Sequence, residues 1–267
     1  MVEAFLLLLL AHVLTDFFFN SRIGGRGIKG ELFHGLVHGM VYILVLLLIT
    51  SRIDILLLFG LGLGVIHALI DMFHRYYLKP RGLRYSSFMV DQWLHLFSIY
   101  LISYLLGQYT AITPAIEINN KLVLRFILIM AAIFPSSVLI RLLIEDFFKR
   151  KRDCQEEGPR EFTGAVIGNY ERLFIVFLMY MEFFLLVGLM MIAKGLFLLK
   201  HECVDREVLT YGTIVSYFIG VAGGMGVLHA DEILITVHNA FEQFGVAMLS
   251  FTMVLVFLLL VHLYENR

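Results

Sequence analysis

The sequence predicts an all-α fold, a polytopic integral membrane bundle of about eight transmembrane helices. Of its 267 residues, 60% are hydrophobic and only 16% are charged, and the mean hydropathy is +0.84. Soluble domains are about 45–50% apolar and about 25% charged. The net charge of −1, with no basic face, excludes a nucleic-acid-binding protein. Cys154 and Cys203 lie far apart outside any CxxC pattern, so the sequence predicts neither a disulfide framework nor a thiolate metal site.

Apolar runs of about 20 residues, the length that crosses a bilayer, recur along the chain. The first run has no basic flank or small-residue cleavage site, so we interpret it as a retained span rather than a signal peptide. The sixth is too long for one perpendicular helix, and we expect Gly164–Arg172 to lie at the interface or in a broken or tilted segment. Pro135 predicts a kink in the fifth. The expected spans are 4–20, 32–50, 54–78, 88–107, 121–146, 165–198, 207–228 and 240–264.

Lysine and arginine concentrate in alternate connections, which predicts the orientation. The connections after the first, third and fifth expected spans are basic, whereas those after the second and fourth carry one basic residue each. The positive-inside rule therefore places the N-terminus outside and the basic connections in the cytoplasm. We expect a multi-pass protein of the inner (cytoplasmic) membrane. The last third is ambiguous, because Lys200 and Arg206 would lie outside.

The sequence suggests three regions. Residues 1–107 form a His/Asp-rich core of four membrane helices, residues 108–162 contain the fifth span and a basic cytoplasmic loop, and residues 163–267 contain the C-terminal membrane helices.

Polar residues interrupt the first four spans at helical spacing. One pattern is His67, Asp71 and His74, at positions i, i+4 and i+7 of an apolar run, which share one helix face. Ionisable groups at membrane depth are costly and usually functional. The other three spans carry the pairs His12 with Asp16, His34 with His38, and Asp91 with His95. In the expected topology all these groups lie at one depth near the cytoplasmic face, so we expect a single buried site.

Imidazole and carboxylate groups are ligands for zinc, iron or manganese. Zinc is the first expectation for a divalent transition metal here, and the surplus of ligands over one tetrahedral site suggests a dinuclear centre or one ion with outer carboxylates. Asp16 or Asp91 is the candidate general base. Four neighbours could assist: Asn20, Glu31, Ser87 and Gln92. The expected metal ligands are His12, Asp16, His34, His38, His67, Asp71, Asp91 and His95.

Structural roles are the alternative to metal binding. Such pairs can join helices by hydrogen bonds of about 0.6 kcal/mol, and His74 borders the interface. His262 is expected to be a packed bundle residue. His238 and Glu242 fit a capped helix start as well as a ligand pair, and Glu182 is expected to pair with Lys194 or another helix. The glycines of 220–226 are attributed to close helix packing.

These motifs resemble a known family. Ala11–Asn20, His34–His38, His67–Asp71 and Asp91–His95 are similar to a bacterial multi-pass membrane family that is catalogued only as a domain of unknown function and is sometimes encoded beside SatD-like regulators. The resemblance to its core covers residues 1–107. Segments around 164–173 and 193–197 resemble the C-terminal part of longer members. The resemblance implies an all-helical membrane protein and no established activity.

The first functional hypothesis is an intramembrane metal-dependent hydrolase acting on a lipid or lipid-linked substrate at the cytoplasmic leaflet. A di-iron lipid oxidase or hydroxylase is the alternative within enzymes. A metal-ion or proton transporter is the second class, although the confinement of the polar groups to one depth disfavours it. A regulatory subunit with a structural metal is the third. No nucleic-acid partner is expected, and the sequence carries no signal of oligomeric state.

Overall fold

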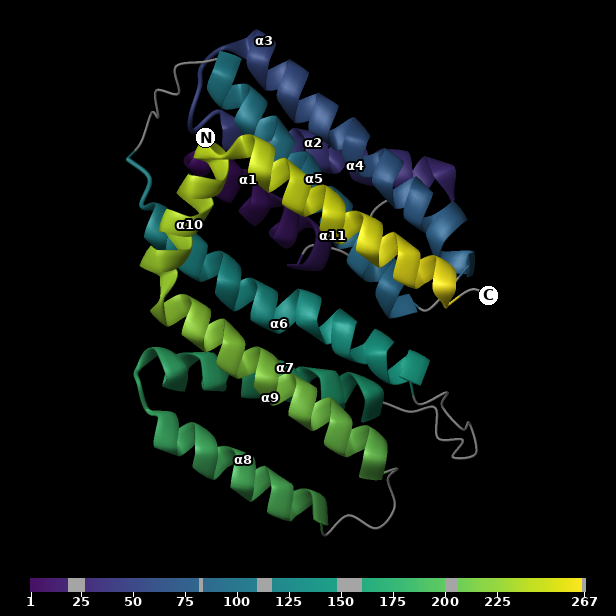
Figure 1. The fold of residues 1–267 in the computed structure, drawn as a ribbon, viewed down its shortest axis with the longest axis vertical. Helices are drawn as coiled ribbons and strands as arrows, with labels where there is room; N and C mark the ends of the chain where they lie inside the picture. The colour runs from purple at the N-terminus through teal and green to yellow at the C-terminus, as the bar shows by residue number, and fades with distance from the viewer. Residues whose placement is uncertain (19–26, 82–83, 110–116, 148–159, 200–205, 266–267) are drawn as a thin grey trace. The chain divides into compact units, whose positions relative to one another are not determined.

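The computed structural model describes residues 1–18, 27–81, 84–109, 117–147, 160–199 and 206–265. Within these ranges all regular structure is helical, which confirms the all-α prediction. The chain divides into two compact units (Figure 1). The first contains residues 1–124 and 231–267, and the second contains residues 125–230. The last two helices therefore belong to the same unit as the first four expected spans.

The first unit is built around long apolar helices. α1 (Val2–Val13) continues into a π-helical turn, η1 (Leu14–Phe18), and α2 spans Ile28–Leu46. A continuous helical stretch from Ile53 to Leu78 consists of α3 (Ile53–Ile55), η2 (Leu56–Leu61), α4 (Gly62–Phe73) and η3 (His74–Leu78). A short 3₁₀ turn, η4 (Lys79–Arg81), follows, and then α5 (Arg84–Tyr109). α10 (Ala230–Glu242) and α11 (Phe244–Tyr264) complete the unit, and α11 packs along α5.

The second unit contains four helices that alternate in direction (Figure 1). They are α6 (Asn120–Phe147, which begins in the first unit), α7 (Arg160–Tyr180), α8 (Phe184–Leu199) and α9 (Arg206–Leu228). The expected single span 165–198 is wrong, because it consists of α7 and α8 joined by a turn. At this turn Glu182 adopts a φ of 61°. Gly164–Arg172, where a broken segment was one expectation, lie inside α7, and the helix is interrupted only after them, at the turn.

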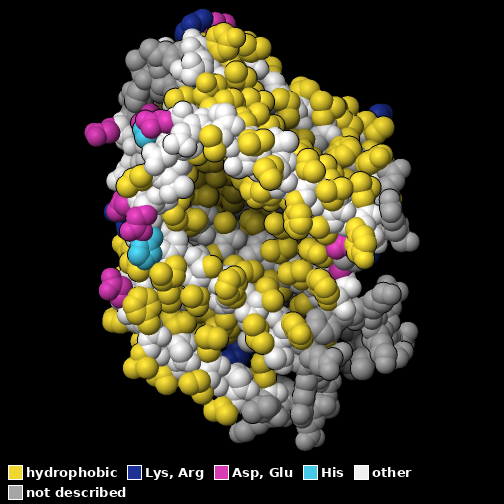
Figure 2. Space-filling view, in the orientation of Figure 1, with side chains coloured by type: hydrophobic (Ala, Val, Ile, Leu, Met, Phe, Trp, Pro, Cys, Tyr) yellow, Lys and Arg dark blue, Asp and Glu magenta, His cyan; other side chains and the backbone are white. Residues whose placement is uncertain are grey.

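In the part of the chain that the structure describes, five helices are long and apolar enough to cross a membrane: 53–78, 84–109, 120–147, 208–228 and 244–264. They correspond to five of the eight expected spans. Hydrophobic side chains cover most of the face drawn in Figure 2, as expected for a surface in contact with lipid tails.

Small residues hold α2 and α4 unusually close together. A Cβ atom on Gly64 would lie 2.6 Å from the backbone oxygen of Gly35 and 2.7 Å from the Cα of Gly39. A Cβ on Gly35 would in turn lie 2.5 Å from the Cβ of Ala68. These residues form small-xxx-small patterns, which let membrane helices approach to backbone contact. The contact brings His38 and His67 together, because each lies within one turn of these glycines.

Small residues also allow α9 to pack closely against its neighbours in the second unit. A Cβ atom on Gly223 would lie 2.8 Å from the Cβ of Ala132, and one on Gly224 would overlap the Cβ of Met179. The interpretation of 220–226 as a packing segment is therefore confirmed.

A buried guanidinium ties α6, α7 and α9 together. Arg172 donates hydrogen bonds to the carbonyl oxygens of Ala132 (2.8 Å) and Ile133 (3.2 Å) and to the hydroxyl of Ser216 (2.8 Å). Those carbonyls lie just before Pro135, which supplies no N–H to the helix ladder and around which α6 nonetheless continues.

Of the two partners expected for Glu182, Lys194 was wrong. Lys194 pairs instead with Glu171 on α7, since the turn places Glu182 at the end of the α7–α8 pair and Lys194 far along α8.

Candidate metal centre

Four helical segments of the first unit bring all the expected metal ligands into one group, which we call the His/Asp cluster. His12 and Asp16 come from α1 and η1, and His34 and His38 from α2. His67 and Asp71 come from α4, and Asp91 and His95 from α5. The helical spacing thus correctly predicted which side chains share a face, and packing of the four segments joins the faces.

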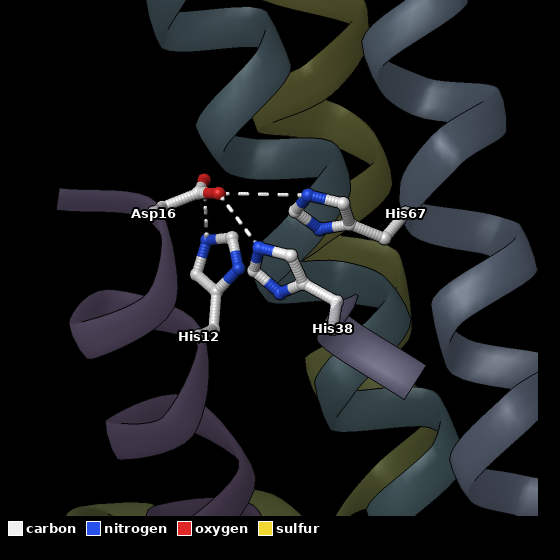
Figure 3. A group of neighbouring side chains, drawn as sticks. All are labelled: His12, Asp16, His38 and His67. Atoms are coloured by element: carbon white, nitrogen blue, oxygen red, sulfur yellow. Dashed lines mark hydrogen bonds and ion pairs between the residues drawn. The ribbon is translucent and has the colours of Figure 1, made fainter. Parts of the chain in front are cut away.

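One half of the cluster surrounds Asp16 (Figure 3). Its Oδ1 lies 2.9 Å from Nε2 of His38, 3.1 Å from Nε2 of His34 and 3.5 Å from Nε2 of His67. Its Oδ2 lies 3.7 Å from Nε2 of His12. Donor atoms of His12, Asp16, His38 and His67 all lie within 4.8 Å of one another.

The other half is organised around Asp71. Its Oδ2 lies 3.3 Å from Nε2 of His67 and 3.9 Å from Nε2 of His34, while Oδ1 lies 3.2 Å from Nε2 of His95. Asp71, Asp91 and His95 form a second possible metal-binding group, and His34, His67 and Asp71 form a third. His67 and Asp71 belong to two groups each, so the halves are continuous and the two Asp71 oxygens face different histidines.

The cluster is buried on all but one edge. His12, His38, His67, Asp91 and His95 are buried. Asp16, His34 and Asp71 are partly exposed, with the adjoining His74 the most accessible at 24%. The site is therefore enclosed by protein but reachable from the edge where α2 begins and α4 ends.

Two π-helical turns lie at the site. Asp16 is inside η1, and His74 begins η3. Such turns shift the register of side chains on a helix and are frequent at functional sites.

The unpaired polar atoms of the cluster fit a metal site. His67 is 1% exposed, its Nδ1 has no hydrogen-bond partner, and its Nε2 faces the Asp16 and Asp71 carboxylates without forming a hydrogen bond. Its ring stacks on that of His38 at 3.6 Å between centroids. Asp91 Oδ1 is likewise buried without a hydrogen bond. A buried polar atom without a partner costs about 1–3 kcal/mol. Coordination to a cation would remove this cost and would offset the charge of the gathered carboxylates, so the residues fit a transition-metal ion.

Surrounding residues orient several of the ligands. Gln92 donates to Asp91 Oδ2 at 3.1 Å, and Ser87 Oγ lies 3.4 Å from Nε2 of His74. Both residues were expected near the site. Tyr42 was not, although its hydroxyl lies 3.3 Å from Nδ1 of His38. The i, i+4 spacing of Tyr42 from His38 was the available signal.

Glu31 also borders the cluster, where it pairs with Arg75 of η3. Asn20 lies outside the described residues.

The residues for which the sequence suggested a structural role lie either at the cluster or away from it. Nδ1 of His74 lies 3.6 Å from Asp91 Oδ1, so His74 adjoins the cluster at its open edge. His262 is buried and lies 3.2 Å from the hydroxyl of Ser86, in agreement with the expected packing role. His238 and Glu242 form an exposed pair on α10 outside the cluster.

Comparison with known proteins identifies a domain but no activity. No curated protein and no solved structure shows a significant match. Residues 4–124 match the model of a protein family of unknown function, DUF3307. The matched residues carry the whole His/Asp cluster, so the cluster lies in the part of the chain that is similar to DUF3307.

Proposed function

We propose that the protein is a membrane metalloenzyme that hydrolyses a lipid or lipid-linked substrate at the cytoplasmic leaflet. The observation that carries the proposal is the set of imidazole nitrogens directed at the Asp16 and Asp71 carboxylates inside a largely apolar unit, among them a fully buried His67 with no hydrogen bond. Groups of this kind at membrane depth are costly unless they have a function.

The donor set favours zinc and two ions. Imidazoles outnumber carboxylates, which suits a borderline-soft divalent ion such as zinc. All five cluster histidines direct Nε2 toward a carboxylate. The two Asp71 oxygens face His67 and His95 respectively, so Asp71 could contribute a ligand to each half of a two-ion site. Paired ions activate water for hydrolysis and stabilise the charge of the transition state.

Asp16 and Asp91 then take different roles. Both oxygens of Asp16 face imidazoles, which supports a role as a ligand at the centre of one half. Asp91 has one oxygen held by Gln92 and the other without a hydrogen bond. Asp91 is therefore the better general base, and Gln92 keeps its carboxylate oriented.

The surroundings of the cluster favour an enzyme over a transporter. Beyond the cluster, toward the far ends of the same helices, the described buried side chains are mainly apolar, as at Leu8, Leu46, Phe59 and Leu63. A transport path requires polar groups through the membrane. An enclosed site with one open edge suits a substrate that enters and leaves on the same side.

The α7–α8 turn supports the cytoplasmic assignment. If α7 and α8 each cross the membrane, the connection that follows α8 returns to the side of the connection after α6. The sequence positions of Lys200 and Arg206 would then fit the positive-inside rule, which a single 165–198 span did not.

A cysteine at Glu182 tests this topology. In a background with Cys154 and Cys203 replaced by serine, Glu182→Cys is expected to react with a membrane-impermeant maleimide added outside intact cells, because the residue lies in an exposed turn. Phe147→Cys, at the exposed end of α6, is the matched control and is expected to react only after the cells are opened. A Glu182→Cys protein that reacts only after opening would contradict the hairpin orientation.

Hydrolysis by the metal-loaded full chain tests the proposed function. Detergent-purified, zinc-loaded protein is expected to release products from a panel of bacterial lipid esters, and His67→Ala is expected to lose at least about 100-fold in rate, since ligand loss should exceed the 10–100-fold effect of an outer partner. His238→Ala, an exposed histidine outside the cluster, is the control. Equal rates for His67→Ala and wild type would overturn the proposal.

A further inference from the structure

The accessible edge of the His/Asp cluster is bordered by an ion pair. Arg75 immediately follows His74 in η3, and Glu31 lies one helical turn before His34 in α2. Nη1 of Arg75 pairs with Oε1 of Glu31. The pair thus joins the two segments that carry the exposed histidines, and it lies where a substrate would reach the metal ligands.

The environment of Arg75 suits recognition of an anion. Glu31 is largely buried, whereas the Arg75 side chain is 40% exposed. A guanidinium has five N–H donors in a planar fork, so a contact through Nη1 leaves donors for a ligand. Glu31 holds the fork in place, and such a preorganised fork matches two oxygens of one phosphate group.

Charges around the edge are arranged in two layers. Lys29 in the first turn of α2 and Lys79 directly after η3 are exposed, while the carboxylates of Asp16 and Asp71 lie further in. Two divalent ions would outweigh the three cluster aspartates, so a bound anion would meet positive charge at both layers. A neutral ester would interact only with the inner layer, where the metal ions would lie.

Exposed apolar and aromatic side chains surround the same edge. Leu32 and Phe33 project from α2, and Phe73, Tyr76 and Tyr77 from the end of α4 and η3, and all five are exposed. Aromatic residues of this kind lie at membrane interfaces. The edge therefore offers cations for a head group and an apolar margin for acyl or prenyl chains.

We propose that the substrate is a membrane lipid with a terminal phosphate ester and that Arg75, held by Glu31, binds the phosphate. This inference rests on the proposed function and specifies its substrate class. The oxygen of water bonds to phosphorus while the bond from phosphorus to the lipid oxygen breaks. One proton of the water passes to Asp91 and then to the departing lipid oxygen, so a lipid alcohol and inorganic phosphate leave.

Phosphate release from phosphatidic acid in mixed micelles tests the inference, with the zinc-loaded full chain as enzyme. Wild type is expected to release inorganic phosphate and no fatty acid, and to act much more weakly on glycerol 3-phosphate, which lacks the chains. Arg75→Gln is expected to raise KM for phosphatidic acid at least about tenfold, the cost of a lost charge-assisted hydrogen bond, with unchanged zinc content. The KM of Arg75→Lys should lie between those of wild type and Arg75→Gln, because lysine keeps the charge but lacks the planar fork of donors.

Arg52→Gln is the matched control. Arg52 precedes the other end of the same helix and pairs with Asp54 as Arg75 pairs with Glu31. Glu31→Gln is expected to raise KM less than Arg75→Gln, because the guanidinium remains but is less fixed. Inorganic phosphate should compete with the substrate in wild type and less in Arg75→Gln.

Three results would overturn the inference while leaving a metal hydrolase in place: release of fatty acid instead of phosphate, equal KM values for Arg75→Gln and Arg52→Gln, or equal rates with glycerol 3-phosphate and phosphatidic acid. A chain that binds no zinc and hydrolyses no ester would overturn the proposed function, and this inference with it.

Discussion

Gly64→Val is expected to disrupt the metal centre without touching a ligand. The Cβ of the new side chain would lie 2.6–2.8 Å from backbone atoms of Gly35 and Gly39, so α2 and α4 must separate. Overpacking of this kind costs about 1–3 kcal/mol and occasionally more. Since His38 and His67 stack across this contact, a displacement of about 1 Å is expected to lower hydrolysis about 100-fold. Thermal unfolding in detergent, metal content and hydrolysis rate measure the three effects.

Gly62→Val is the matched control for this prediction. A Cβ at Gly62 meets nothing within 4 Å, and the substitution adds the same β-branched side chain to the same helix. It is expected to alter metal content and rate little. If the Gly64 and Gly62 variants behaved alike, close packing of α2 on α4 would not be what positions the histidines.

Asp71→Ala is expected to have the largest effect among single ligand substitutions. Its two oxygens lie 3.3 Å from His67 and 3.2 Å from His95, so it serves both halves of the cluster. We expect the zinc content to fall from two ions to less than one, and the hydrolysis rate to fall more than 100-fold, beyond the 10–100-fold range of residues outside the ligand set. Metal content measured with activity on the same preparations checks this.

Two further variants serve as comparisons for Asp71→Ala. Asp54→Ala removes an exposed carboxylate from the start of the same helical stretch and should retain both ions. His12→Ala removes a histidine from the Asp16 half alone and should retain the ion of the other half. Full occupancy in Asp71→Ala would show that this carboxylate does not bridge two ions.

The candidate site could be predicted from sequence because its information is local. Each pair, such as Asp91 with His95, shares a helix face by its spacing, and the cost of polar groups in an apolar helix directs those faces toward one another. The all-α class likewise followed from composition. His262 was correctly predicted to pack inside the bundle, where it lies beside Ser86.

The features that were missed depend on contacts between distant segments or on small backbone changes. The turn at Glu182 has no proline or glycine in 181–183 to mark it, so 165–198 reads as one apolar run. The partner of Lys194 depends on that turn. The α2–α4 contact requires glycines on two helices at matching heights, which neither segment reveals alone. The pairing of Arg75 with Glu31 joins residues 44 positions apart in the sequence, so spacing gives no indication of it.

Elemental analysis of the full chain, purified in detergent without added metal, tests the central claim most directly. The proposed function leads us to expect about two transition-metal ions per chain, mainly zinc, with occupancy lowered in His38→Ala and Asp71→Ala and retained in His238→Ala. A wild-type chain free of transition metal that also fails to take up zinc on addition would contradict a metal centre in the His/Asp cluster.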